Sequence, residues 1–271
     1  DLSFLHLLFY IKSGTNLDTV LGVENGAQQN RIVGGSQRIC EELAQRLGDA
    51  VQVAQPVRLL RQSDSAVELI TDQGSHRAAR VIFALPPTQL LRITQDPLLP
   101  GWRDQLLQRL PQGAVIKCMA LYERPFWRER GLSGQATSEV GPVRLTFDNS
   151  VPGSGKGVLL GFIEGDEARQ LSSRDRAERQ AQVLECFARY YGEQALQPLE
   201  YVDKCWADEA FARGCYAALF PPGAWSNGAA RLREPYGRVH LAGTETATRW
   251  MGYFDGAVQA AERAVAEVLR A

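Results

Sequence analysis

The chain has 271 residues, a formal net charge of −1 at pH 7 and 45% hydrophobic residues. That length and apolar content suit one large domain or two ordinary ones. Acidic and basic residues are interspersed, so no basic stripe indicates a nucleic-acid partner. The five cysteines include no Cys-x-x-Cys pair and the three histidines are scattered. This pattern argues against a structural metal site and for a reducing intracellular compartment.

No segment has the roughly 20 apolar residues of a membrane-spanning helix. The run from Leu5 to Ile11 is too short, and no hydrophobic tail precedes Ala271. The first residues, Asp1-Leu-Ser-Phe, form neither a signal peptide nor a transit peptide and look like an interior start. We therefore expect a soluble, cytoplasmic protein without a membrane anchor.

The first 48 residues show helical periodicity on both sides of a polar segment. A helix is expected to begin near Leu2 and to end at Lys12-Ser13-Gly14. Residues 16–30 are polar and contain glycine, which predicts a loop. Ser36 suits the N-cap of a second helix that ends at Gly48. Three apolar residues of that helix are expected to face the core: Ile39, Leu43 and Leu47.

Between residues 49 and 83 the apolar residues alternate, which predicts strands. We expect one strand at Val51 and Val53, a short antiparallel meander, and a return strand that reaches Phe83. Pro86 and Pro87 prevent a continuing central strand, and a domain crossing is expected there. Farther on, the pattern predicts helices over 102–110 and 174–191, strands over 114–122, 143–147 and 158–163, and strand and loop over 201–216.

The C-terminal segment reads as strand, loop and helix. Residues 239–242 predict a short buried strand that Gly243 ends, and a helix begins past Gly252. The helix carries its apolar residues on one face: Val258, Ala261, Val265, Val268 and Leu269. Gly252, Gly256 and Ala257 leave room for a close approach to the backbone, and a helix start suits an anion. An ordinary strand–loop–helix cap explains this pattern equally well.

The segment Gly243-Thr-Glu-Thr-Ala-Thr-Arg-Trp-Met-Gly-Tyr-Phe-Asp-Gly-Ala-Val258 resembles the C-terminal flavin-binding signature of the monoamine oxidases. It departs from the usual pattern at Met251 and Asp255, where serine and glutamate are typical. The resemblance implies that Tyr253 stands before the flavin ring. It also implies FAD contacts at six positions: Gly243, Thr244, Glu245, Gly252, Phe254 and Ala257.

Lys117 interrupts an apolar strand, where an ammonium must be paired, hydrated or neutralised. Strand alternation alone allows it simply to point outward. The surrounding residues 111–118 resemble the monoamine oxidase stretch whose lysine holds a water against the reactive flavin nitrogen. The resemblance therefore implies a catalytic role for Lys117.

Cys215 and Tyr216 follow Gly214 on an expected loop. A free cysteine is ordinarily a small buried hydrophobe. By resemblance, however, Cys215 matches the cysteine that forms a thioether to FAD. Tyr216 and Tyr253 match the paired aromatic walls that orient the substrate amine, although each alone reads as a core residue. Trp206, nine positions before Cys215, resembles a tryptophan near the flavin.

Weaker resemblances cover the remaining predicted contacts. Val57 resembles a contact on the adenine side of FAD. Four residues resemble positions that line the substrate pocket: Leu21, Gln28, Leu145 and Phe162.

The resemblance runs from about Leu5 to Ala271, but the N-terminal Gly-x-Gly-x-x-Gly unit of the family is missing. It implies an incomplete two-domain flavin amine oxidase fold of the mixed α/β (α+β) class, with a mixed sheet in the substrate domain. Residues 32–106 and 209–271 would belong to the FAD-binding domain. Residues 1–31 and 107–208 would form the substrate-binding domain.

The function implied is FAD-dependent oxidation of a primary or other monoamine to imine and aldehyde, with molecular oxygen reduced to hydrogen peroxide. Three alternatives keep the fold: polyamine, amino-acid or protoporphyrinogen oxidation. Another class of explanation is a non-catalytic fragment that lacks half of the FAD site and binds a partner. The sequence leaves the oligomeric state open, a homodimer included.

Overall fold

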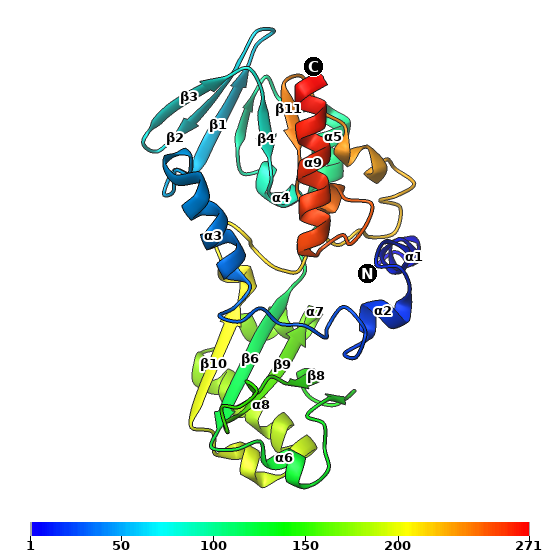
Figure 1. The fold of residues 1–271 in the computed structure, drawn as a ribbon. Helices are drawn as coiled ribbons and strands as arrows, with labels where there is room; N and C mark the ends of the chain where they lie inside the picture. Colours follow the sequence, from blue (N-terminus) through cyan, green and yellow to red (C-terminus); the bar gives the residue numbers. More distant parts are fainter. Residues whose placement is uncertain (1, 271) are drawn as a thin grey trace. The chain divides into compact units, whose positions relative to one another are not determined.

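The computed structural model describes residues 2–270 and divides the chain into two compact units. The first unit comprises Asp1–Pro111 and Ala217–Ala271, and the second comprises Gln112–Tyr216. The first unit is thus assembled from two separate stretches of sequence, whereas the second is one continuous segment (Figure 1). Residues 2–31 group with the first unit, where Ser3 N donates to the carbonyl of Phe220 at 3.1 Å. The ends Asp1 and Ala271 of the predicted domain ranges lie outside the described residues.

The first unit begins with three helices, α1 (Phe4–Ser13), α2 (Leu17–Leu21) and α3 (Gln37–Leu47). The predicted loop over 16–30 was wrong where α2 forms, because Asn16 caps that helix by accepting from Thr19 N at 2.8 Å. Gly48, with φ of 53°, ends α3 as expected and enters a 3₁₀ turn, η1 (Gly48–Ala50). The strand predicted at Val51 and Val53 was wrong, because residues 51–53 follow this turn without regular secondary structure.

Two sheets follow in the first unit. The larger has the order β3-β2-β1-β5 and contains β1 (Val57–Gln62), β2 (Val67–Thr71), β3 (Gly74–Ala78) and β5 (Thr94–Asp96). The smaller pairs β4 (Val81–Phe83) in parallel with β11 (Val239–Leu241). The remaining elements of the unit are α4 (Pro87–Leu90), α5 (Gly101–Gln108), η4 (Ala229–Arg233), η5 (Thr244–Thr246) and α9 (Phe254–Arg270).

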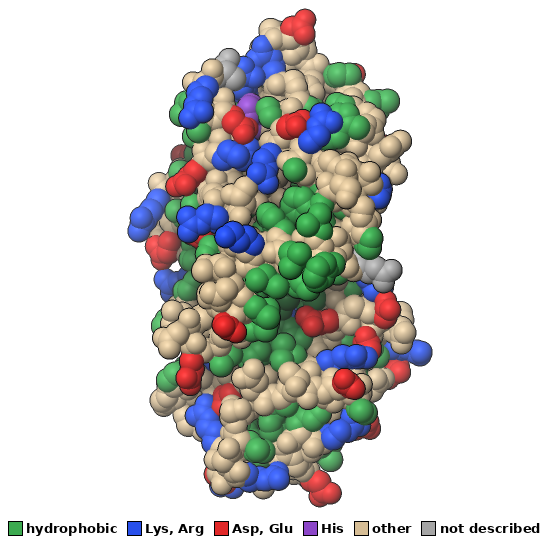
Figure 2. Space-filling model, turned by 90° about the vertical axis from the view of Figure 1, so that its right-hand side faces the viewer, with side chains coloured by type: hydrophobic (Ala, Val, Ile, Leu, Met, Phe, Trp, Pro, Cys, Tyr) green, Lys and Arg blue, Asp and Glu red, His purple; other side chains and the backbone are tan. Residues whose placement is uncertain are grey.

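The apolar faces of α3 and α9 do not form the core of the first unit. Leu43 and Leu47 are 53% and 61% exposed, so the prediction that the apolar residues of α3 face the core was wrong. In α9 the buried residues are Gly256, Ala260 and Ala264, whose small side chains let the helix pack closely. Helical periodicity identifies an apolar face but does not say whether anything covers it. Figure 2 shows exposed hydrophobic side chains on one face of the molecule.

The second unit is a five-stranded antiparallel sheet with helices. Its order is β10-β6-β9-β8-β7, formed by β6 (Val115–Tyr122), β7 (Ala136–Thr137), β8 (Val143–Asp148), β9 (Gly157–Glu164) and β10 (Glu200–Cys205). The helices are α6 (Phe126–Glu129), α7 (Gly165–Ser172), α8 (Arg176–Tyr191), and the 3₁₀ turns η2 (Glu193–Leu196) and η3 (Trp206–Asp208).

Side-chain alternation gives this sheet two different faces. On one face, Cys118 and Ile163 are buried in a core that includes Phe187 of α8. The Phe187 ring packs directly on Gly161, since a Cβ at that glycine would lie 2.9 Å from the ring. The opposite face, called the open face below, carries residues paired across four strands. These residues are Leu145, Phe147, Leu160, Phe162, Lys117, Met119, Val202 and Lys204.

Candidate functional site

Lys117 lies on the open face beside two aromatic rings, those of Tyr216 and Phe162. Its Nζ is 4.9 Å from the ring centroid of Tyr216 and 5.6 Å from that of Phe162. Both distances are within the range at which an ammonium is attracted to a ring face. Leu145 pairs with Phe162 from β8 and so shares this face. Four predicted site residues from separate stretches of sequence therefore meet in the second unit.

Two glycines fix the segment that carries Cys215 and Tyr216. Cys215 N donates to the carbonyl of Gly113 at 2.9 Å. A Cβ at Gly113 would lie 2.1 Å from the carbonyl oxygen of Cys215, and one at Gly214 would lie 2.4 Å from that of Gly113. Gly214 also has a φ of 137°. No other residue fits either position without moving this segment.

Cys215 is a half-buried free thiol whose protonation depends on its neighbours. Burial raises its pKa to about 11, and the positive charge of Lys117 lowers it while the negative charge of Glu164 raises it. The thiol is consequently neutral near pH 7. Lys117 therefore favours the thiolate, whereas Glu164 opposes it.

Trp206 begins η3 and carries a buried polar atom that needs an acceptor. Its Nε1 has no hydrogen-bond partner within residues 2–270, and the same holds for Oε1 of Gln112. Gln112 packs on Gly214, where a Cβ would come 2.9 Å from the Gln112 side chain. Because buried N–H groups are nearly always paired, the indole N–H marks a position where a bound group or water would fit.

In the first unit Tyr253 contacts another predicted residue, Gln28. The Gln28 amide donates to the carbonyl of Val20 at 3.2 Å and to the Tyr253 hydroxyl at 3.5 Å. Tyr10 lies 6.4 Å from Tyr253 between ring centroids, and burial and its hydrogen bond with Tyr253 raise the Tyr10 pKa. Leu21 is 64% exposed in the same unit. Tyr10 was not predicted as a site residue, because its position in a helical pattern is its one signal in the sequence. The predicted pairing of Tyr253 with Tyr216 stays a prediction.

The signature residues Gly243, Thr244 and Glu245 hold their own loop together. Thr244 Oγ1 accepts from Gly252 N at 2.8 Å, and a Cβ at Gly243 would lie 2.4 Å from the carbonyl of Leu85. Glu245 is buried and accepts from Ala218 N at 2.9 Å, and its burial raises its pKa.

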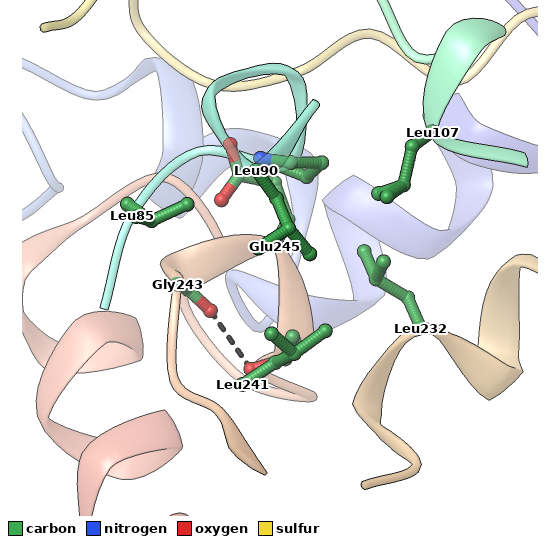
Figure 3. Close-up of a pocket in the computed structure, with 9 residues that line it drawn as sticks. Leu85, Leu90, Leu107, Leu232, Leu241, Gly243 and Glu245 are labelled. Carbon is green, nitrogen blue, oxygen red and sulfur yellow. Dashed lines mark hydrogen bonds between the residues drawn. The ribbon is translucent and has the colours of Figure 1, made fainter. Parts of the chain in front are cut away.

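Gly243 and Glu245 also line a small cavity of about 10 Å³ together with leucines that include Leu85, Leu90, Leu107, Leu232 and Leu241 (Figure 3). A cavity of this volume holds one water at most. It is therefore not a place where a flavin ring would bind.

The start of α9 combines a positive φ of 86° at Gly252 with an exposed Phe254 and a half-buried Ala257. A Cβ at Gly256 would lie 2.1 Å from the carbonyl oxygen of Trp250. The close approach predicted at Gly256 is thus made by the protein's own loop. The first turn of a helix in general presents N–H groups without helical partners, which suits a group rich in acceptors. Val57 packs, half-buried, against the core of the first unit.

Over the part of the chain that the structure describes, no group of three or more His, Cys, Asp or Glu side chains is arranged to hold a metal ion. Over the same residues, no helix combines the length and the apolar character needed to cross a membrane.

Comparisons with known proteins show which family this chain resembles. Residues 4–269 match the family described as flavin containing amine oxidoreductase. The chain is 45% identical over 268 residues to a Mycobacterium tuberculosis protein named as flavin-containing monoamine oxidase AofH, covering 99% of this chain and 58% of that one. It therefore spans little more than half the length of this relative.

Solved structures resemble the chain as well. The cyclohexylamine oxidase of Brevibacterium oxydans has a TM-score of 0.93 at 31% identity, over 100% of this chain and 60% of that one. A putrescine oxidase bound to putrescine has a TM-score of 0.83 at 35% identity, over 88% and 53%. These structures confirm the predicted fold class of a mixed α/β flavin amine oxidase.

Proposed function

Because the chain belongs to the family of flavin-containing amine oxidoreductases, we propose that it is the C-terminal part of an FAD-dependent monoamine oxidase. The proposed reaction removes two electrons and two protons from the amine to give an imine, and molecular oxygen takes them up as hydrogen peroxide. Water then hydrolyses the imine to an aldehyde and releases the nitrogen as ammonia or as the corresponding amine. Since the chain spans 58% of the relative AofH, this activity is proposed for a longer polypeptide that contains it.

The observation that carries this proposal is the position of Lys117 over the rings of Tyr216 and Phe162. The Lys117 ammonium would hold a water by donating hydrogen bonds into the open face. The ring of Tyr216, which is 52% exposed, would orient the amine nitrogen without accepting a proton from it. Phe162 and Leu145 would bind the apolar part of a monoamine.

Bound FAD would supply the two-electron redox chemistry that protein side chains do not provide. The residues present fit such a group, because the buried Trp206 N–H needs an acceptor and the Cys215 thiol is only half-buried. In the first unit, the first turn of α9 with Gly252, Phe254 and Ala257 would suit an acceptor-rich group. Gly243, Thr244 and Glu245 would act by holding the loop before α9.

A thioether between Cys215 and FAD is part of this proposal. The thiol must lose its proton, which burial opposes and Lys117 favours. We expect the intact gene product to be yellow and to keep its flavin after acid denaturation. Release of all flavin by acid would reject the covalent link and leave the oxidase proposal standing.

The test of the function is peroxide release by the intact gene product across a panel of amines. Turnover of benzylamine or an alkyl monoamine is expected, and no peroxide with any amine would reject the proposal. Adding FAD to the purified 271-residue chain tests the alternative of a non-catalytic fragment. The predicted cytoplasmic location and homodimer stay predictions.

Oxidation of a diamine is a second candidate function. Glu164 pairs with Val115 two residues along from the Lys117–Phe162 pair, so its carboxylate lies on the open face. A carboxylate there would pair with the distal ammonium of a diamine. Faster turnover of putrescine than of an alkyl monoamine, lost in Glu164→Gln, would favour this candidate.

A further inference from the structure

Lys117 faces a second lysine across the sheet. Lys204 of β10 is the direct partner of Lys117 in the antiparallel pairing of β10 with β6, so both side chains lie on the open face. Like charges directly opposite each other in a sheet destabilise that pairing. Something must therefore offset the charge of Lys204.

Glu209 provides this compensation. Its carboxylate forms an ion pair with the Lys204 ammonium, which also lies 5.9 Å from the ring centroid of Trp206. The two side chains are 49% and 43% exposed, so the pair itself contributes little to stability. The pair matters because Glu209 belongs to the turn that precedes Cys215 and Tyr216.

The backbone of Glu209 anchors the turn that leads to the candidate site. Its carbonyl accepts from Arg213 N at 2.8 Å and from Ala212 N at 3.2 Å. Cys215, two residues after Arg213, is bound to Gly113, and the ring of Tyr216 lies against Lys117. Lys117 is thus connected to the segment over 209–216 in two ways. One runs through its register partner Lys204 and the ion pair with Glu209, and the other is its direct contact with the ring of Tyr216.

We propose that Lys204 and Glu209 are a positioning pair, which holds the turn over 209–213 so that Cys215 and Tyr216 meet Lys117. The register places two further charged residues on this face, Glu164 of β9 and Glu200 of β10, whereas Asp203 of β10 lies on the opposite face and pairs with Arg179. The positioning itself is independent of the proposed function. Its consequence for amine oxidation rests on that function.

The test measures how strongly Lys117 acts on the Cys215 thiol in the 271-residue chain. Iodoacetamide alkylation of Cys215 is followed from pH 7 to pH 10 by mass spectrometry of the tryptic peptide over 214–231. In the parent chain, Lys117→Met is expected to slow alkylation on the order of tenfold, because it removes the cation that favours the thiolate. In the Glu209→Gln background the same substitution should change the rate less than about twofold.

Matched variants separate positioning from general stability. Lys204→Met should act like Glu209→Gln, and Lys204→Arg should restore the Lys117 effect because it keeps the ion pair. Glu123→Gln breaks the exposed pair of Glu123 with Lys156 in the same unit and should leave the Lys117 effect unchanged. Continued protection of the buried Cys118 and Cys186 shows that each variant is folded.

An equal effect of Lys117→Met in the parent, Glu209→Gln and Lys204→Met backgrounds would overturn the proposal. No effect of Lys117→Met in the parent chain would also overturn it, because Lys117 would then not act on Cys215 at all. Only that second result counts against the site geometry that the oxidase proposal uses. The absence of amine turnover with the expected alkylation pattern would reject the function alone.

Discussion

Gly113 and Cys215 are bound backbone to backbone, with the Cys215 N–H donating to the Gly113 carbonyl at 2.9 Å. Gly113→Ala would bring a methyl group to 2.1 Å from the Cys215 carbonyl oxygen, so one of the two segments must move. We expect a loss of about 1–3 kcal/mol in the free energy of unfolding, measured by urea denaturation. Cys215 should also become more accessible to alkylation. Gly131→Ala, where a Cβ would meet nothing within 4 Å, is a comparison without the clash, although its φ of 74° adds backbone strain.

The buried ion pair of Arg179 and Asp203 is expected to be essential for the second unit. The guanidinium donates twice to the carboxylate, at 2.8 and 3.0 Å, and links α8 to β10. The side chains are 13% and 4% exposed, so Asp203→Asn leaves an uncompensated buried charge. We expect a loss of about 3–5 kcal/mol in urea unfolding.

The control for this prediction is the exposed pair of Arg169 and Asp166, whose side chains are 54% and 85% exposed. Asp166→Asn should change stability by less than about 0.5 kcal/mol. Similar losses for Asp166→Asn and Asp203→Asn would contradict the argument that burial decides the difference.

Sequence periodicity predicted strands β6, β8 and β9 and helix α8 of the second unit because each buries one face, but it did not predict α6, β7 or α7. It failed at α3, whose apolar residues have the same helical spacing but remain exposed. The strand expected at Val51 and Val53 failed for a related reason. A strand needs a partner strand, and alternation over a few residues does not supply one. The segment at Val51 and Val53 instead follows the 3₁₀ turn η1.

The candidate site was predictable only in part. Lys117 was conspicuous because a charge interrupts an apolar strand, and the structure places it against Tyr216. Lys204 and Gly113 were not predictable, because their importance depends on the β6–β10 register and on a backbone approach between distant segments. Such pairings are properties of the folded chain and leave no periodic signal in the sequence.

His6 is expected to make stability depend on pH. Its side chain is buried, and its ring stacks on that of Phe220 with 4.6 Å between the ring centroids. Its Nδ1 accepts a hydrogen bond from Trp225 Nε1 at 3.2 Å. Burial lowers its pKa from 6.5 to about 4. Between pH 4 and pH 6.5, His6 binds more protons in the unfolded chain than in the folded chain. The stability that neutral His6 contributes is therefore fully present above pH 6.5 and is lost as pH falls toward 4.

His6 should change the free energy of unfolding by at most about 1.4 kcal/mol per pH unit in this range. Urea unfolding at pH 4.5, 5.5, 6.5 and 7.5 measures it, with Cys40→Ser as a neutral comparison. His6→Gln keeps an acceptor for Trp225 but cannot titrate in this range, so its stability should vary less over the window. An unchanged slope in His6→Gln would assign the effect to another group.

Lys117→Met tests the residue on which the oxidase proposal depends. Methionine fills a similar volume beside Tyr216 and Phe162 but cannot hold a water by donating hydrogen bonds. We expect the intact, flavin-bound gene product to show flavin reduction by substrate slowed by about two orders of magnitude, since removing one positioned polar group typically costs that much. Anaerobic stopped-flow absorbance measures this rate, and thermal unfolding shows that the variant remains folded. Lys156→Met replaces an exposed lysine of the same unit and should leave the rate unchanged. If Lys117→Met reduces flavin as fast as Lys156→Met, the ammonium has no part in the reaction, and its contact with the two rings is only structural.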